Sequence, residues 1–99
     1  MNECEMIQAF AKLDGASVEQ PYGDKFYRAI GCTLFEYNPI EDLALNCAAR
    51  DKYKVENDFD DESCFIYDHE NGTHFEVGFN GDIPRATIEC ILKSKGLWK

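Results

Sequence analysis

Three stretches of the chain have apolar residues at the spacing of amphipathic helices. The first helix is predicted over residues 3–14, with a capping box from Asn2 and Glu5 and a left-handed stop at Gly15. Its apolar face would consist of Met6, Ile7, Phe10 and Leu13. The second helix should open at Asn38 and fade near Asp51, because Asn is a good cap and a proline follows it. Its apolar stripe would consist of Ile40, Leu43, Ala44, Cys47 and Ala48.

The third helix is predicted to begin at Asp82 or Ile83, where a proline lies in the first turn. Gly96 fits a left-handed stop, after which Leu97 would pack back onto Leu92. The core face of this helix would consist of Ile88, Ile91 and Leu92.

Strand patterns lie between the helices. Residues 16–20 form a short candidate strand that ends at Pro21 and a Tyr22-Gly23-Asp24 turn. Residues 25–37 form a longer candidate, and apolar residues on both alternating faces indicate that both faces are at least partly covered. Residues 53–56 form a third candidate, a short edge strand.

The strongest strand signals are residues 63–70 and 73–79, which Asn71-Gly72 joins. An Asn-Gly pair between strands favours a two-residue hairpin with a type I′ turn. The second strand alternates apolar and polar residues, so one of its faces should be buried. His69 and His74 would then face each other across the turn.

The order of the predicted elements is α-β-β-α-(β)-β-β-α, without an internal repeat or a linker. With 99 residues, of which 13% are aromatic, the chain has the length and apolar content for one modest core. Residues 1–99 are therefore predicted as a single α+β domain, a sandwich in which three helices pack with a small antiparallel sheet that contains a β-hairpin.

Several segments resemble one family. "KLDGA" ends the first helix, "EYNPIEDLALNCAARDKY" surrounds the second, and "GDIPRATIECILKSKGLWK" follows the hairpin. Together they resemble the phage ABA sandwich family, small uncharacterised proteins of bacteriophages and prophages. Leu43 departs from the pattern, since such proteins often have Trp or another aromatic residue there. The resemblance implies a helix-sheet-helix architecture and a phage origin, and no known enzymatic chemistry.

Acidic residues are concentrated in the middle of the chain, whose net charge is −9. Residues 37–82 contain twelve acids and three bases, whereas residues 83–99 are basic. This charge makes a bare phosphate backbone a poor partner. The densest stretch is "ENDFDDE", residues 56–62, where five of the seven residues are acids.

Three interpretations of this stretch remain open: a solvated loop, an opportunistic site for a hard cation, and a surface for a basic partner. A calcium-binding EF-hand is excluded, because its glycine would fall at Ser63 and its closing Glu at His69. Phe59 would either anchor a partner or lie in the core. The residues predicted for the partner surface are Glu56, Asp58, Phe59, Asp60, Asp61, Glu62, Asp68, Glu70, Glu41 and Asp42.

No catalytic or metal-binding constellation stands out. The five cysteines have no CxxC spacing and are predicted to be buried thiols of a reducing cytoplasm. Cys32 or Cys64 would need an electropositive setting to act as a nucleophile, and the surrounding charge is negative. The two histidines do not assemble the four ligands of a zinc site. We therefore expect neither an enzyme nor a cofactor or metal.

These patterns lead to two hypotheses about function. The first is a phage accessory protein that binds a basic host protein stoichiometrically and inhibits a defence complex, in the manner of an anti-CRISPR protein or a DNA mimic. The second is a binder of a small ligand such as a nucleotide signal, with Arg85, Lys93 and Trp98 as the site. A phage accessory protein without an inhibitory role is a third interpretation. Neither a signal peptide nor an apolar stretch of membrane-spanning length is found, so we expect the cytoplasm of a bacterial host.

Overall fold

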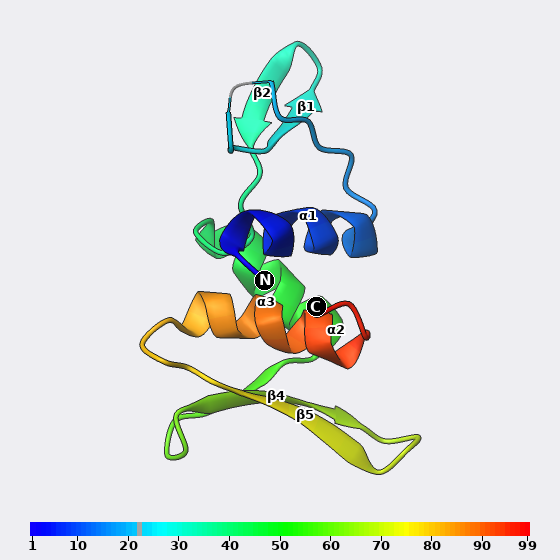
Figure 1. The fold of residues 1–99 in the computed structure, drawn as a ribbon, viewed down its shortest axis with the longest axis vertical. Helices are drawn as coiled ribbons and strands as arrows, with labels where there is room; N and C mark the ends of the chain where they lie inside the picture. The colour runs from blue at the N-terminus through cyan, green and yellow to red at the C-terminus, as the bar shows by residue number, and fades with distance from the viewer. Residues whose placement is uncertain (22) are drawn as a thin grey trace.

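The fold contains three helices and two small antiparallel sheets (Figure 1). The computed structural model describes residues 1–21 and 23–99, so the turn predicted at Tyr22-Gly23-Asp24 includes a residue outside the described part. The α+β class and the predicted order of elements are confirmed. The elements are α1 (Glu3–Asp14), β1 (Tyr27–Ile30), β2 (Thr33–Glu36), α2 (Leu43–Tyr53), β3 (Glu56–Asp58), β4 (Ser63–Asp68), β5 (Thr73–Gly78) and α3 (Ile83–Ser94).

The layers are stacked along the 44 Å long axis of the molecule. The β3–β4–β5 sheet forms one end, α3 lies on the inner face of this sheet with α2 beside it, and α1 lies beyond α3 (Figure 1). The β1–β2 hairpin, which we call the arm, projects from the opposite end. All three helices lie on one side of this sheet, and no helix or strand of the described residues covers its outer face (Figure 1).

The central helix, α3, contributes more buried apolar residues to the core than any other element. Cys90 and its apolar neighbours are completely buried between the sheet and the other two helices, and the Cys90 thiol donates to the carbonyl oxygen of Phe75 across 3.3 Å. Asp82 caps the helix start by accepting a hydrogen bond from the backbone N–H of Arg85. At the other end the N–H of Leu97 bonds to the carbonyl oxygen of Leu92, which confirms the predicted stop. The completely buried apolar side chains of α3 are Ile88, Cys90, Ile91 and Leu92.

Helix α1 also agrees with its prediction, because the signals that define it are local. The Asn2 side chain accepts from the N–H of Glu5 at 2.8 Å, and the Glu5 carboxylate accepts from the N–H of Asn2 at 3.1 Å. Gly15 ends the helix with a left-handed φ of 72°. Met6, Phe10 and their neighbours then pack into the core as expected.

The predicted start and apolar face of α2 were wrong. Asn38 caps a separate turn by accepting from the N–H of Ile40, and the helix starts four residues later than expected, with Asp42 as its cap. Leu43 is 71% exposed, whereas Asn46 and Ala49 are the buried residues of the helix. Of the predicted stripe, Ile40 is buried but precedes the helix, and the remaining residues besides Leu43 are small, so the helix turns its larger side chains, Leu45 and Tyr53, partly into the core. The other exposed members of that stripe are Ala44, Cys47 and Ala48.

The single strand predicted over residues 25–37 is in fact the two-stranded arm. Gly31 reverses the chain with φ 64°, and Ile30 pairs with Thr33 across a two-residue turn, which is typical of a type II′ hairpin. The predicted coverage of both faces was therefore wrong, since most of the arm is exposed. The strand predicted over residues 16–20 is reduced to one bridge, between Glu19 and Tyr27.

Two details of the second sheet also differ from the predictions. Asp68 pairs with Thr73, so the β4–β5 loop has four residues, and Asp68 accepts from the N–H groups of Glu70 and Asn71. Asn71 has no positive φ, which excludes the type I′ turn. Strand β3 lies later than the predicted 53–56, because α2 extends through Tyr53 and the next residue ends it in a left-handed conformation.

Two predictions about reactive side chains were also wrong. His74 pairs with Tyr67 and not with His69, whose ring lies 4.6 Å from the Tyr67 ring within the loop region. Cys32 and Cys47 are exposed, so burial of the thiols is confirmed only for the pair between β4 and α3. The two buried cysteines are Cys64 and Cys90.

Candidate protein-binding face

The outer face of the β3–β4–β5 sheet presents an aromatic side chain between two glutamates. Phe65 on the central strand pairs with Glu56 on one side and with Glu76 on the other. Directly paired residues have Cβ atoms about 4.5–5.5 Å apart, so the two carboxylates flank the phenyl ring. Side chains of the opposite parity, such as Cys64, point into the core against α3. The register of the three strands thus places one aromatic side chain, Phe65, between two glutamates on the outer face of the sheet.

A shallow groove of about 250 Å³ runs along this face. Beside Phe65, its walls include Tyr67, half exposed, and Asp58, partly exposed. His74 lies at one end, where its Nε2 is 3.6 Å from the Oε2 of Glu76. The groove therefore combines aromatic surface with carboxylates, the combination that attracts a cationic side chain.

The β3–β4 turn extends this acidic face at one end of the sheet. The Asp58 carboxylate accepts from the N–H groups of Asp60 and Asp61, at 3.1 and 3.2 Å, and so holds the turn. Phe59 is 69% exposed, and its ring lies 5.8 Å from that of Phe79. Phe59 is therefore not a core residue, and its role as an anchor for a partner stays a prediction.

The carboxylates of this turn are not neutralised by the protein's own cations. The ion pairs that lysines form within residues 1–21 and 23–99 lie elsewhere, and none includes an acid from residues 56–62. Glu62 and its neighbours in the turn are exposed. A cationic partner could therefore approach these groups without first breaking an internal salt bridge.

The structure separates the other predicted partner residues from this turn. Asp68 is the last residue of β4 and Glu70 lies in the β4–β5 loop, so both are at the far end of β4, about 17 Å away. Asp68 has a local role, because hydrogen bonds from the side chain and the N–H of Asn71 lower the pKa of its carboxyl. These two acids form a second cluster, apart from the β3–β4 turn.

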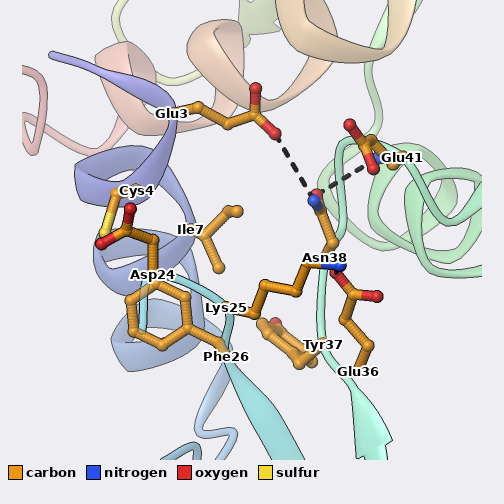
Figure 2. A pocket seen from close by; sticks show the side chains of 10 residues that line it. All are labelled: Glu3, Cys4, Ile7, Asp24, Lys25, Phe26, Glu36, Tyr37, Asn38 and Glu41. Carbon is orange, nitrogen blue, oxygen red and sulfur yellow. Dashed lines mark hydrogen bonds and ion pairs between the residues drawn. The ribbon is translucent and has the colours of Figure 1, made fainter. Parts of the chain in front are cut away.

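Glu41 and Asp42 lie outside the sheet region, at the start of α2. Asp42 caps that helix, and its carboxylate accepts from the N–H of Ala44. Glu41 lines a hollow of about 230 Å³ between α1 and the base of the arm, where Asn38 contacts Glu3 (Figure 2). The ten predicted residues thus form two clusters at the ends of the sheet and a third near α1.

The three residues predicted for a small-ligand site lie in two separate places. Lys93 lies over the Trp98 ring at 5.4 Å from its centroid and pairs with Glu89. Arg85 is in the first turn of α3, eight residues before Lys93 and so about 12 Å away along the axis. Lys93 and Trp98 thus contact each other, whereas Arg85 lies apart from them, and binding of a small ligand stays a prediction.

Two further searches of the described chain gave no candidates. No three His, Cys, Asp or Glu side chains within residues 1–21 and 23–99 are arranged to hold a metal ion. Over the same residues, no helix is long and apolar enough to cross a membrane.

Comparisons with known proteins add no name to this fold. No protein-family model, no curated protein and no solved structure matches the chain. The resemblance to the phage ABA sandwich family therefore stays a prediction.

The most informative residues of the face, Phe65 and Glu76, were not among those predicted from the sequence. The usable signal was the presence of aromatic residues at alternate positions of β4, with Glu76 and His74 at the paired positions of β5. Both parities of β4 are apolar, however, so the sequence pattern did not reveal which side faces outward.

Proposed function

We propose that this protein acts by stoichiometric binding to a protein with a basic surface, using the outer face of the β3–β4–β5 sheet. One observation carries this proposal: Phe65 lies between Glu56 and Glu76 on a sheet face that no element within residues 1–21 and 23–99 covers. An arginine or lysine of the partner would lie over the ring and meet a carboxylate on either side. Cation–π attraction and charge-assisted hydrogen bonds would act together there.

The acidic β3–β4 turn, which adjoins this face, would add both electrostatic attraction and binding affinity for the partner. Its exposed acids, with Asp60 and Asp61 at the tip, would speed the encounter with a positive surface and disfavour acidic partners. Charge of this kind gives less affinity than buried apolar contacts do, and Phe59 supplies such a contact beside the acids. The turn is held by Asp58 and the strands are backed by α3, so little order would have to be gained on binding.

Inhibition would follow from competition with phosphates. Basic surfaces of nucleic-acid-binding proteins hold a backbone of regularly spaced anions, and carboxylates on a rigid sheet would occupy the same Lys and Arg side chains. The resemblance to phage proteins makes a host defence complex, of the CRISPR-Cas kind or another, the partner that we propose. In this scheme the protein works in the bacterial cytoplasm and contacts neither nucleic acid nor membrane. It needs no cofactor and catalyses no reaction.

A pull-down from bacterial lysate with quantified prey tests this function. The bait variant Glu56→Gln/Glu76→Gln removes the two carboxylates beside Phe65 and keeps the side-chain volumes. The matched control Glu19→Gln/Asp51→Asn removes the same charge from exposed positions off the sheet face. We expect the sheet variant to reduce capture at least about tenfold and the control to reduce it far less. Equal capture by both variants would mean that net charge, and not this face, selects the partner.

The acidic turn is tested separately by Asp60→Asn, Asp61→Asn and Glu62→Gln together, which leave Asp58 in place to hold the turn. Binding of the purified partner should then become slower and less sensitive to salt. Unchanged association at low salt would exclude the turn from the interface.

A further inference from the structure

The arm is the most exposed apolar part of the described chain, and it is remote from the acidic sheet. Ile30 is 55% exposed, Leu34 43% and Phe35 49%. Register places Ile30 and Phe35 on one face of the hairpin and Leu34 on the other, so both faces carry apolar surface. A two-stranded hairpin is marginally stable by itself in water, and this one packs mainly on itself (Figure 1).

One edge of the arm is open for further strand pairing. The N–H of Tyr37 bonds to the carbonyl oxygen of Phe26 at 2.7 Å, and hydrogen-bonded pairs alternate with non-hydrogen-bonded pairs in an antiparallel ribbon. The backbone N–H and C=O of Leu34 and Glu36 therefore point away from β1. On the opposite edge, the equivalent groups of Tyr27 are bonded to Glu19 in both directions, at 2.8 and 2.9 Å.

Apart from the charged Glu36 at its end, the free edge lacks the features that normally prevent pairing. Natural edge strands are protected by lysines, prolines, bulges or covering elements. Thr33, Leu34 and Phe35 carry no charge, and β2 has no third strand within the described residues. Such a strand is self-complementary, because two copies related by a two-fold axis pair in antiparallel fashion through the same residues.

Charge does not oppose a second copy at this edge strongly, because the arm is almost neutral. Residues 25–36 contain two cations, Lys25 and Arg28, and one anion, Glu36, so the arm carries +1 in a chain of −9. The acidic sheet lies at the far end of the 44 Å axis, so pairing through the arms keeps the two acidic regions apart. At that separation, several Debye lengths at physiological salt, their repulsion is screened.

We propose that two copies of this chain associate through their β2 edges, so that the two arms form one four-stranded antiparallel sheet. The interface uses fewer residues than the roughly 20–30 per side of a standard interface. The dimer is therefore weak and in exchange with the monomer. It leaves the outer sheet face free in both copies, so each dimer would present that face twice.

Sedimentation equilibrium of the whole chain, from about 10 µM to about 1 mM, tests this association. We expect a closed monomer–dimer equilibrium that added salt does not weaken. A chain that stays monomeric throughout this range overturns the inference. Open-ended association that salt dissolves overturns it too, because that behaviour indicates the arm of one copy on the acidic sheet of the next.

Two proline variants locate the paired edge. Leu34→Pro removes an outward N–H from β2, and Ala29→Pro removes the corresponding outward N–H from β1, so each proline occupies an edge position that tolerates it. We expect Leu34→Pro to raise the dissociation constant at least about tenfold and Ala29→Pro to leave it nearly unchanged. Equal effects of the two variants would contradict pairing through β2.

Hydrogen exchange of the unmodified chain gives a readout that does not depend on any variant. The amide of Leu34 should exchange more slowly as the protein concentration rises, while that of Ala29 should not change. Concentration-independent exchange at Leu34 would exclude the proposed edge contact.

Discussion

The side-chain amide of Asn46 on α2 donates a hydrogen bond to the backbone carbonyl oxygen of Pro84, 3.0 Å away, at the start of α3. The same amide nitrogen donates to the carbonyl oxygen of Pro39 at 2.8 Å. Asn46 is completely buried, so one polar side chain ties the turn before α2, α2 itself and α3 together. The helix pair behind the sheet is aligned by this contact as well as by apolar packing.

Replacing Asn46 with leucine should destabilise the fold strongly. Two carbonyl oxygens would lose a buried partner, and each unsatisfied group of this kind costs about 1–3 kcal/mol. We expect a loss of about 2–4 kcal/mol in urea unfolding followed by circular dichroism. Leu43→Ala, on the exposed side of the same helix, should change stability by less than about 0.5 kcal/mol. Similar losses for the two variants would argue against the structural role of Asn46.

The stability of the fold should fall in alkaline solution because of Tyr37. Burial raises the pKa of this tyrosine from 10.0 to about 12, and the Asp14 carboxylate adds to the shift. A group with a higher pKa in the folded state keeps its proton longer there, so folding binds protons between pH 10 and 12. The stabilisation is complete below pH 10 and is lost as the pH rises to 12, by up to about 2–3 kcal/mol.

The variant Tyr37→Phe separates the effect of Tyr37 on alkaline stability from the effects of other titrating groups. The Tyr37 hydroxyl is buried without a hydrogen-bond partner among the described residues, so its removal should be neutral or stabilising by about 1 kcal/mol at pH 8. The variant should lose less stability than the wild type between pH 9 and pH 11, which urea unfolding at each pH measures. Some pH dependence of the stability should remain in this variant, because a hydrogen bond to Asp14 raises the pKa of Lys52 and burial raises that of Tyr53. Equal pH profiles of stability for the variant and the wild type would exclude Tyr37 as a cause of the alkaline loss.

The cysteines should divide into two classes of reactivity. Cys32 at the tip of the arm and Cys47 on α2 are exposed, whereas Cys64 and Cys90 are buried against each other. Contact with the Cys64 thiol and burial raise the pKa of Cys90, which disfavours the reactive thiolate. Alkylation of the native protein, read by peptide mass spectrometry, should label the exposed pair more than about a hundredfold faster than the buried pair. Loss of this difference in urea would confirm that the fold protects the buried pair.

The elements predicted well from the sequence are those whose signals lie within a few residues. The capping box of α1 and the stop that Gly96 makes after α3 both involve neighbours in the chain. Helix α2 was misplaced because two good caps lie four residues apart: Asn38 is used by a separate turn, and Asp42 caps the helix. The arm was missed because apolar residues on both faces of a strand usually indicate burial, whereas here they are exposed at the end of the molecule.

The candidate site also has a part that was predictable from the sequence and a part that was not. The acids of the β3–β4 turn were predictable as a group, since they are consecutive in the chain. The arrangement of Glu56, Phe65 and Glu76 depends on the register of three strands, and a shift of one residue in any strand would have turned its side chains to the other face. That register is set by turns and by α3, which are non-local determinants.

The position of α3 at the centre of the molecule also affects how the chain is made. The sheet and α1 both pack on this helix and have few contacts with each other. While a ribosome is synthesising the first eighty residues, neither has its main partner, and their apolar faces remain open to chaperones and proteases. Folding into the mature shape therefore waits for residues 83–94 to leave the exit tunnel, and it should then proceed in one cooperative step.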